Sequence, residues 1–255
     1  MSCNNDTQKK KYKKYFTLSF DDGVTQDLKI IEILKRNGVR CCTFNLNSGI
    51  CGMNSEWVGI ALGDPSMTHI RFTEDELRSG IYDGFDLAAH SSKHPSLKIY
   101  DESPEDIIRE VQGDVERIEE LTGIRPIGMA WPGGDAEYTD KTAELIEKYT
   151  DVKFARASTS KYGFELPKQF LKWYPTCCFM DGRLFEMAER FLAENAEDGD
   201  KLFYVWGHGY ELDLKGFNSY LEFEKLIVMM RDAEDVELVT NSEFYRIFEG
   251  DIPLL

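Results

Sequence analysis

The sequence has no hydrophobic run long enough to form a membrane-spanning helix, and no C-x-x-C pair with the spacing of a zinc site. Residues 1–14 are polar and rich in lysine, so no apolar core of a secretion signal is visible. We therefore expect a cytoplasmic protein, or an extracellular one if a signal has been removed. No internal repeat, low-complexity segment or linker divides the chain. We predict a polar extension over residues 1–14 and one domain over residues 15–255.

Basic side chains are fewer than acidic ones: the chain has 30 Lys and Arg residues and 46 Asp and Glu residues, and its net charge is -16. An acidic surface repels nucleic acid and anionic membranes, so we expect neither as a partner. Cysteines number only six. The neighbours Cys41-Cys42 and Cys177-Cys178 would point to opposite faces of a strand, which disfavours disulfides. We expect mostly buried, reduced cysteines.

Segments typical of strands alternate with segments typical of helices along the chain. The predicted strands cover residues 15–20, 40–46, 85–89, 126–130, 152–155, 202–206 and 236–239. The predicted helices cover residues 26–36, 103–121, 139–149, 181–196, 218–230 and 242–248, and another begins at Thr73 with Glu76 as its capping-box partner. The alternation indicates parallel strands, and about seven repeats in this length favour an α/β barrel over an open sheet.

Unusual polar or aromatic residues follow the predicted strands directly. They are Asp21-Asp22, His90, Trp131-Pro132, Arg156 and His208. In a parallel barrel the carboxyl ends of all strands meet at one face, which carries the active site. We therefore expect these residues to converge, although they are far apart in the sequence.

His90 and His94 are four residues apart, so on one helical turn they would face the same way. Two imidazoles and one carboxylate can bind a metal ion and still leave positions open for water and substrate. Asp22 can supply the carboxylate. The pattern predicts a metal-dependent hydrolase.

Four segments resemble, in order and spacing, the motifs of polysaccharide deacetylases with the NodB homology domain (carbohydrate esterase family 4). The segments are residues 17–23 (TLSFDDG), 90–94 (HSSKH), 131–134 (WPGG) and 206–208 (WGH). The resemblance implies a distorted (β/α)7 barrel. It also implies one divalent metal held by Asp22, His90 and His94, most often Zn2+, with Co2+, Ni2+, Mn2+ or Fe2+ as alternatives.

The resemblance further implies the roles of two side chains in the hydrolysis of an N-acetylated sugar or oligosaccharide. Asp21 would be the general base that takes a proton from the attacking water, and His208 the general acid that protonates the leaving amine. Backbone amides of residues 43–45, or those after the fourth strand, would help to hold the oxyanion.

The third motif departs from the family pattern, which often has an arginine that orients the catalytic aspartate. Here residues 129–134 contain no arginine, and Arg125 lies at the start of the strand, too far from the site. Arg156 ends the next strand at the correct face. We predict that Arg156 takes the missing position beside Asp21, and that Trp131 and Pro132 contact substrate.

Other substrate contacts are predicted with alternatives. Trp173 either lines the pocket beside His208 or belongs to the core. Asn45 contacts substrate or makes a hydrogen bond on the loop side of its strand. Trp57, in the irregular segment 48–72, stacks on a sugar ring or anchors the loop. His69, in the same segment, matches no motif and is expected at the surface.

Two other functions fit the same motifs. One is hydrolysis of cyclic amides or of O-acetyl esters on the same fold, because the motifs fix the chemistry of the broken bond better than the substrate. The other is an inactive carbohydrate-binding relative, which the missing arginine favours and the intact motif residues disfavour. The sequence leaves a homo-oligomer open.

Overall fold

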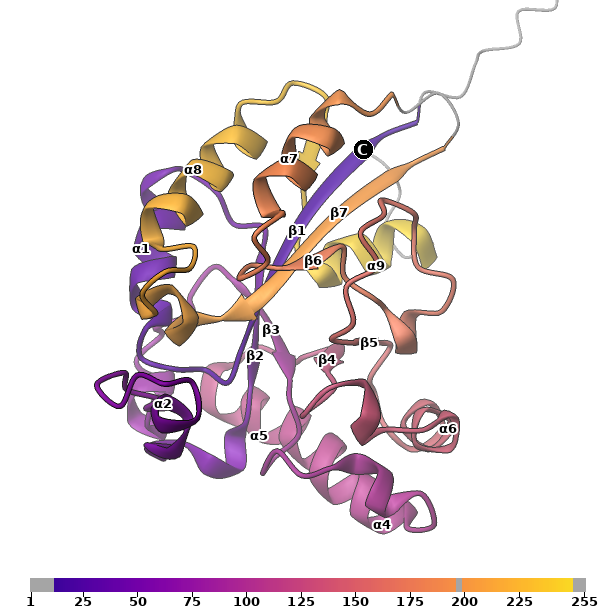
Figure 1. The fold of residues 1–255 in the computed structure, drawn as a ribbon. Coiled ribbons are helices and arrows are strands. Elements are labelled where there is room, and N and C mark those ends of the chain that lie inside the picture. The colour runs from indigo at the N-terminus through magenta and orange to yellow at the C-terminus, as the bar shows by residue number, and fades with distance from the viewer. Residues whose placement is uncertain (1–11, 196–198, 250–255) are drawn as a thin grey trace, which may run out of the picture.

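The structure is a computed structural model that describes residues 12–195 and 199–249. Within these residues, eight parallel strands form one sheet in the order β5-β4-β3-β2-β1-β7-β6, with β8 also paired to β1. The strands are β1 (Lys14–Asp21), β2 (Cys42–Leu46), β3 (Asp86–Ala89), β4 (Gly128–Ala130), β5 (Phe154–Arg156), β6 (Cys177–Cys178), β7 (Lys201–His208) and β8 (Val236–Leu238). Figure 1 shows β1 and β7 side by side through the middle of the molecule.

The sheet curls into a distorted barrel, which confirms the predicted fold class. An irregular segment links its two edges. Trp173 forms a parallel bridge with Arg156 of β5, and the amide of Thr176 donates a 2.9 Å hydrogen bond to the carbonyl of Tyr204 in β7. The segment then forms β6, whose two residues are too few to give a detectable periodicity. This strand was not predicted.

Helices cover the outside of the sheet. They are α1 (Asp27–Arg36), α2 (Trp57–Ala61), α3 (Glu74–Arg78), α4 (Pro104–Ile107), α5 (Gly113–Thr122), α6 (Asp140–Tyr149), α7 (Leu184–Ala193), α8 (Tyr220–Arg231) and α9 (Asn241–Glu249). Figure 1 places α1, α7 and α8 on one side of β1 and β7, and α9 on the other. The capping box predicted for Thr73 and Glu76 is present at the start of α3.

One predicted helix, over residues 103–121, contains a π-helical turn between α4 and α5. This turn, η3 (Ile108–Gln112), brings the carbonyl of Glu110 to the amide of Ser92 at 2.8 Å. π-Helical turns are frequent at functional sites. Here the turn supports the loop that carries the two motif histidines.

The side chains of β1 alternate between two environments, as the two-residue period of a strand requires. Phe16, Leu18 and Phe20 pack into the large core under the helices. Tyr15 packs inside the barrel, in a second cluster with the rings of α9. By the same alternation Asp21, the last residue of β1, faces the inside of the barrel at its carboxyl end.

The remaining predictions on the fold concern termini, cysteines and membranes. The predicted extension over residues 1–14 falls mainly outside the described residues, and β1 begins at its last residue, Lys14. The cysteines within the described ranges are free. None of the helices described is both long and apolar enough to cross a membrane.

Candidate active site

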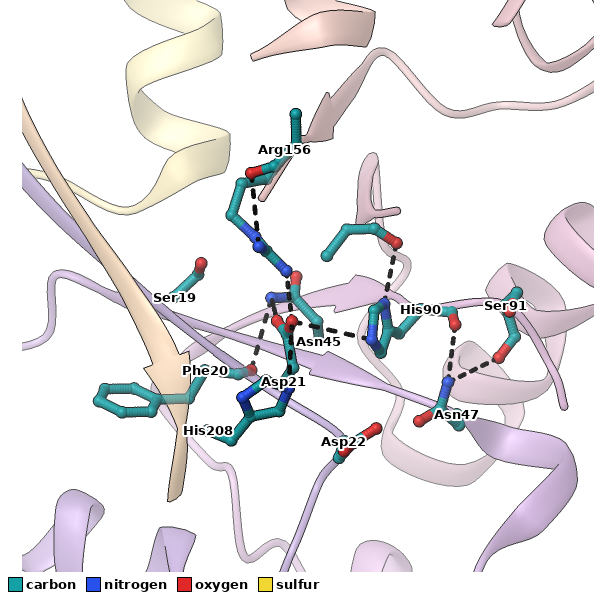
Figure 2. A network of polar contacts seen from close by, with 12 residues as sticks. Ser19, Phe20, Asp21, Asp22, Asn45, Asn47, His90, Ser91, Arg156 and His208 are labelled. Atoms are coloured by element: carbon teal, nitrogen blue, oxygen red, sulfur yellow. Dashed lines mark hydrogen bonds and ion pairs between the residues drawn. The ribbon is translucent and has the colours of Figure 1, made fainter. Parts of the chain in front are cut away.

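The register of the sheet brings three polar side chains to one level. Asp21 at the end of β1 is paired with Asn45 of β2 on one side and with His208 of β7 on the other. Each side chain faces the interior because residues paired in register lie on the same face of a sheet. Figure 2 shows Asn45, His90, Arg156 and His208 gathered around the carboxylate of Asp21.

Asp21 is almost completely buried and is held from both sides. Its Oδ1 accepts a 2.7 Å hydrogen bond from Asn45 Nδ2, and its Oδ2 is paired with Arg156 Nη2. His90 Nε2 lies 3.7 Å and His208 Nε2 lies 4.0 Å from the same Oδ2. Burial alone would raise the pKa of Asp21, but the positive charge of Arg156, followed by the two histidines, lowers it below its ordinary value. Asp21 is therefore an oriented, ionised carboxylate at neutral pH.

Arg156 is fixed in turn by its surroundings. Its guanidinium carbon lies 4.1 Å from the centre of the Trp206 ring, a cation–π contact. Its side chain is 1% exposed. An arginine pinned against a ring has little freedom to leave Asp21, so the geometry matches the arrangement that we predicted for these two residues.

Asp22 leaves the strand in the opposite direction, with a left-handed backbone (φ 78°) that a residue with a side chain rarely adopts. Its Oδ2 lies 2.9 Å from His69 Nε2, and its Oδ1 accepts a 2.8 Å hydrogen bond from Arg71 Nη2. Burial opposes ionisation, but the hydrogen bond to His69 and the nearby positive charges hold the pKa of Asp22 well below its ordinary value. The backbone turn explains how adjacent aspartates serve two sets of partners.

The loop after β3 carries His90 and His94. The Nδ1 of His90 is 2.9 Å from the carbonyl of Ala130, so Nδ1 carries the proton and Nε2 is left free. Burial lowers the pKa of His90 to about 4, which keeps this imidazole neutral. Ser91 and His94 have left-handed backbones (φ 60° and 57°), so the loop turns sharply and does not continue as a helix. The predicted helical turn is wrong, although both imidazoles still meet, with ring centres 4.8 Å apart.

Buried hydrogen bonds fix this loop. Asn47 Nδ2 donates to the carbonyls of His90 and Ser91 at 2.6 and 2.9 Å (Figure 2). Asp114 on α5 accepts from the amide of His90 at 3.0 Å and from the amide and hydroxyl of Ser48 at 2.8 and 2.6 Å. These hydrogen bonds hold the left-handed backbone of the histidine loop in place. Such a strained backbone persists only where the surrounding structure compensates its cost.

Asp22, His90 and His94 fit a divalent metal. One potential ligand atom from each lies within 4.8 Å of the other two. The three side chains offer two imidazoles and one carboxylate, a ligand set that suits zinc and related ions. A carboxylate oxygen can accept more than one partner, so the contacts of Asp22 with His69 and Arg71 leave lone pairs for a metal.

His208 lies across the site from His90. Its Nδ1 is 3.0 Å from Glu211 Oε1, and its amide donates to Glu211 Oε2 at 3.0 Å. Burial disfavours the charged imidazole, but the carboxylate of Glu211, followed by Asp21 and Asp22, raises the pKa of His208 to about 9. His208 is therefore protonated at neutral pH, with Nε2 directed to Asp21.

These residues line a single cavity of about 800 Å³, which is within the size range of small-molecule binding sites. Its floor contains the two aspartates and the three motif histidines. Trp131 lines one wall, and its position is fixed by a 2.9 Å hydrogen bond from Nε1 to the carbonyl of Leu171 and by stacking on Tyr138. Trp57 lines the mouth, with 66% of its surface exposed.

A family model described as polysaccharide deacetylase matches residues 8–153, which is more than half of the chain. The chain belongs to the polysaccharide deacetylase family. No curated protein is significantly similar to it in sequence.

Solved structures with the same fold share little sequence with this deacetylase-family chain. A mutant of the peptidoglycan deacetylase PdaC from Bacillus subtilis is 16% identical, with 94% of this chain and 93% of that chain covered and a TM-score of 0.52. A mutant of BA3943, a CE4 family pseudoenzyme, is 16% identical, with 91% and 67% covered and a TM-score of 0.54. The chain spans about half the length of two further solved deacetylases.

Some residues predicted to contact substrate do not reach the cavity of this family member. Trp173 is fully buried and packs against Phe244 and Tyr204, because its strand segment closes the barrel. Its predicted place beside His208 is wrong, and the core alternative is correct. Asn45 is 1% exposed and bonds to Asp21. Pro132 is buried and does not line the cavity, whereas its neighbours Trp131 and Gly133 do.

The prediction that His69 lies at the surface is also wrong. His69 is 2% exposed, contacts Asp22 and packs on the ring of Tyr210 at 4.9 Å. It lies in an irregular segment without periodicity, so nothing in the sequence distinguished it from a solvent-facing residue. Glu211, in a short 3-10 helix (Gly209–Asp213) directly after β7, was missed because no pattern singled it out. Arg71 was missed for the same reason as His69. The only available signal was that a polar residue of a long loop in a compact domain often serves a site.

Proposed function

We propose that this protein removes the acetyl group from an N-acetylated carbohydrate by metal-dependent hydrolysis of the amide bond. The observation that carries the proposal is that the two adjacent aspartates at the end of β1 face different partners. Asp22 faces His90 and His94, while Asp21 faces Arg156 and His208 in the same cavity.

The metal set supplies one part of the chemistry. A divalent ion held by Asp22, His90 and His94 would act as a Lewis acid on the amide and lower the pKa of water. Zinc is the ion that this donor set favours. His69 and Arg71 orient the carboxylate of Asp22, and Ala130 fixes which nitrogen of His90 is free.

Asp21 accepts the proton of the attacking water. Its low pKa keeps it ionised, and Arg156 and Asn45 prevent its carboxylate from rotating. Asn45 thus acts through Asp21 and not on the substrate.

His208 donates the proton that the leaving amine requires. At neutral pH its imidazole carries two protons, one shared with Glu211 through Nδ1 and one on Nε2 facing the cavity. Cleavage of the C–N bond then yields acetate and a free amine. The base and the acid are different residues, which lets both be in the correct state at one pH.

The proposal is tested with the purified protein supplied with zinc and a panel of N-acetyl sugars, acetyl esters and cyclic amides. We expect acetate and amine to be released in equal amounts from at least one N-acetyl sugar. Turnover of only esters or only cyclic amides would show that the proposed substrate is wrong, while the proposed active site would stand. Sugar binding without any turnover, with metal bound, would favour an inactive carbohydrate-binding protein.

A further inference from the structure

The mouth of the cavity has an apolar wall that the chemistry at its floor does not require. We call this wall the apolar rim. It lies on α2 and on the segments directly before and after it, and consists of Ile50, Met53, Trp57, Val58, Ala61 and Leu62. Trp57, Leu62 and Met53 are 66%, 49% and 45% exposed. Contiguous apolar side chains exposed at a cavity mouth mark a surface that a ligand covers.

The apolar rim is firmly attached to the catalytic floor. Val58 packs in a small core with Val24 and Tyr210. At the base of the loop, Arg71 Nη1 donates to Ser55 Oγ at 3.2 Å while its Nη2 donates to Asp22. The rim therefore stands at a defined position relative to the metal set.

We propose that the apolar rim binds an alkyl or aryl group attached to the sugar, so that the substrate is an amphiphilic N-acetylated glycoside. This inference rests on the function proposed above. The acetyl carbonyl must reach the buried floor, where His90 is 1% and Asp22 6% exposed. The acetyl methyl is one bond from that carbonyl and stays at the floor. The part of the substrate that reaches the exposed rim is its sugar and whatever the sugar carries.

The test compares a methyl and a hexyl glycoside of N-acetylglucosamine. Full burial of one methylene raises affinity about fourfold, and an open wall covers a chain only in part. We expect the hexyl glycoside to have a KM about 10-fold lower, with kcat little changed. In a Trp57→Ser/Leu62→Ser variant this preference disappears, so that the KM values of the two glycosides differ by less than about twofold.

Leu221→Ser is the matched control, because Leu221 is 78% exposed on α8 and does not line the cavity. It should keep the full preference for the hexyl glycoside. Equal KM values for the two glycosides in the wild type would overturn the proposal. So would a preference for N-hexanoyl over N-acetyl substrates that the rim variant removes, because the rim would then bind the acyl chain. A dimer in gel filtration that only the rim variant dissociates would instead make the rim an interface between copies.

A second measurement separates this inference from the proposed function. Calorimetry with the hexyl and methyl glycosides reports binding whether or not acetate is released. Tighter binding of the hexyl form that the rim variant loses, without turnover, supports the apolar rim and refutes the deacetylase. Turnover without any preference for the hexyl glycoside refutes the apolar rim and supports the deacetylase.

Discussion

The replacement Glu211→Gln tests how the acid is kept protonated. Glu211 is the largest of the groups that raise the pKa of His208, and it acts through a 3.0 Å contact with Nδ1. Glutamine has nearly the same shape but no charge, and its amide nitrogen stabilises the neutral imidazole that is protonated on Nε2. Burial, which lowers this pKa, is then opposed only by Asp21 and Asp22.

The size of the effect follows from the pKa of His208, which is about 9 against 6.5 for an ordinary histidine. A fall of about one pH unit in this pKa lowers the protonated fraction at pH 9 from about one half to about one tenth. We therefore expect the alkaline limb of kcat to move at least one pH unit towards neutrality, with about a fivefold loss of rate at pH 9. At pH 6 the loss should be within about twofold.

The replacement Glu211→Gln should also lower the stability of the protein. Because the pKa of His208 is raised on folding, its ion pair stabilises the protein fully below pH ~6.5, and this contribution is lost as the pH rises through about 9. The variant should therefore melt at a lower temperature than the wild type at pH 6, and the difference should shrink at pH 10.

The assay is a pH–rate profile of acetate release from pH 5 to 10, with melting curves at the two extremes. Glu186→Gln, an exposed residue of α7, is the control for loss of one negative charge. An alkaline limb that stays in place in Glu211→Gln while kcat falls equally at every pH would refute the account of the proton donor.

Three further variants separate the other roles. Asp21→Asn should retain zinc, measured by plasma mass spectrometry, and lose at least about 100-fold in kcat; loss of zinc would contradict the assignment of the base. Arg156→Met leaves Asp21 buried beside a neutral side chain, so we expect about 3–5 kcal/mol lower stability in urea unfolding and an acid limb of kcat at higher pH; an unmoved acid limb would exclude Arg156 as its partner. Arg71→Met should weaken zinc binding about 10- to 100-fold in competition with a chelator, whereas unchanged affinity would show that Arg71 does not orient Asp22.

The sequence predicted the barrel and the floor of the site because both depend on apolar strands. Each strand ends where its apolar run ends, so the residue after the run lies at the carboxyl face, as Asp21, His90 and Arg156 do. The same reasoning excluded Arg125, which the structure places in surface ion pairs with Glu119 and Asp151.

The sequence could not place side chains whose position depends on irregular backbone. His69 and Arg71 reach Asp22 from a segment without period, and no spacing rule relates them to β1. Trp173 was ambiguous because a tryptophan beside a site and one in a core have the same local sequence. The left-handed turns at Asp22 and His94 were unpredictable, since they occur at residues that rarely adopt them and only their tertiary contacts compensate the strain.

The central claim is that a metal held by Asp22, His90 and His94 enables this chain to hydrolyse an N-acetylated sugar. The most direct measurement is acetate release from such a sugar by one preparation before chelation, after removal of metal by a chelator, and after zinc is restored. The account predicts turnover that is lost with the metal and regained with zinc, and a His94→Ala variant that regains none. Turnover that persists in the metal-free protein would contradict it.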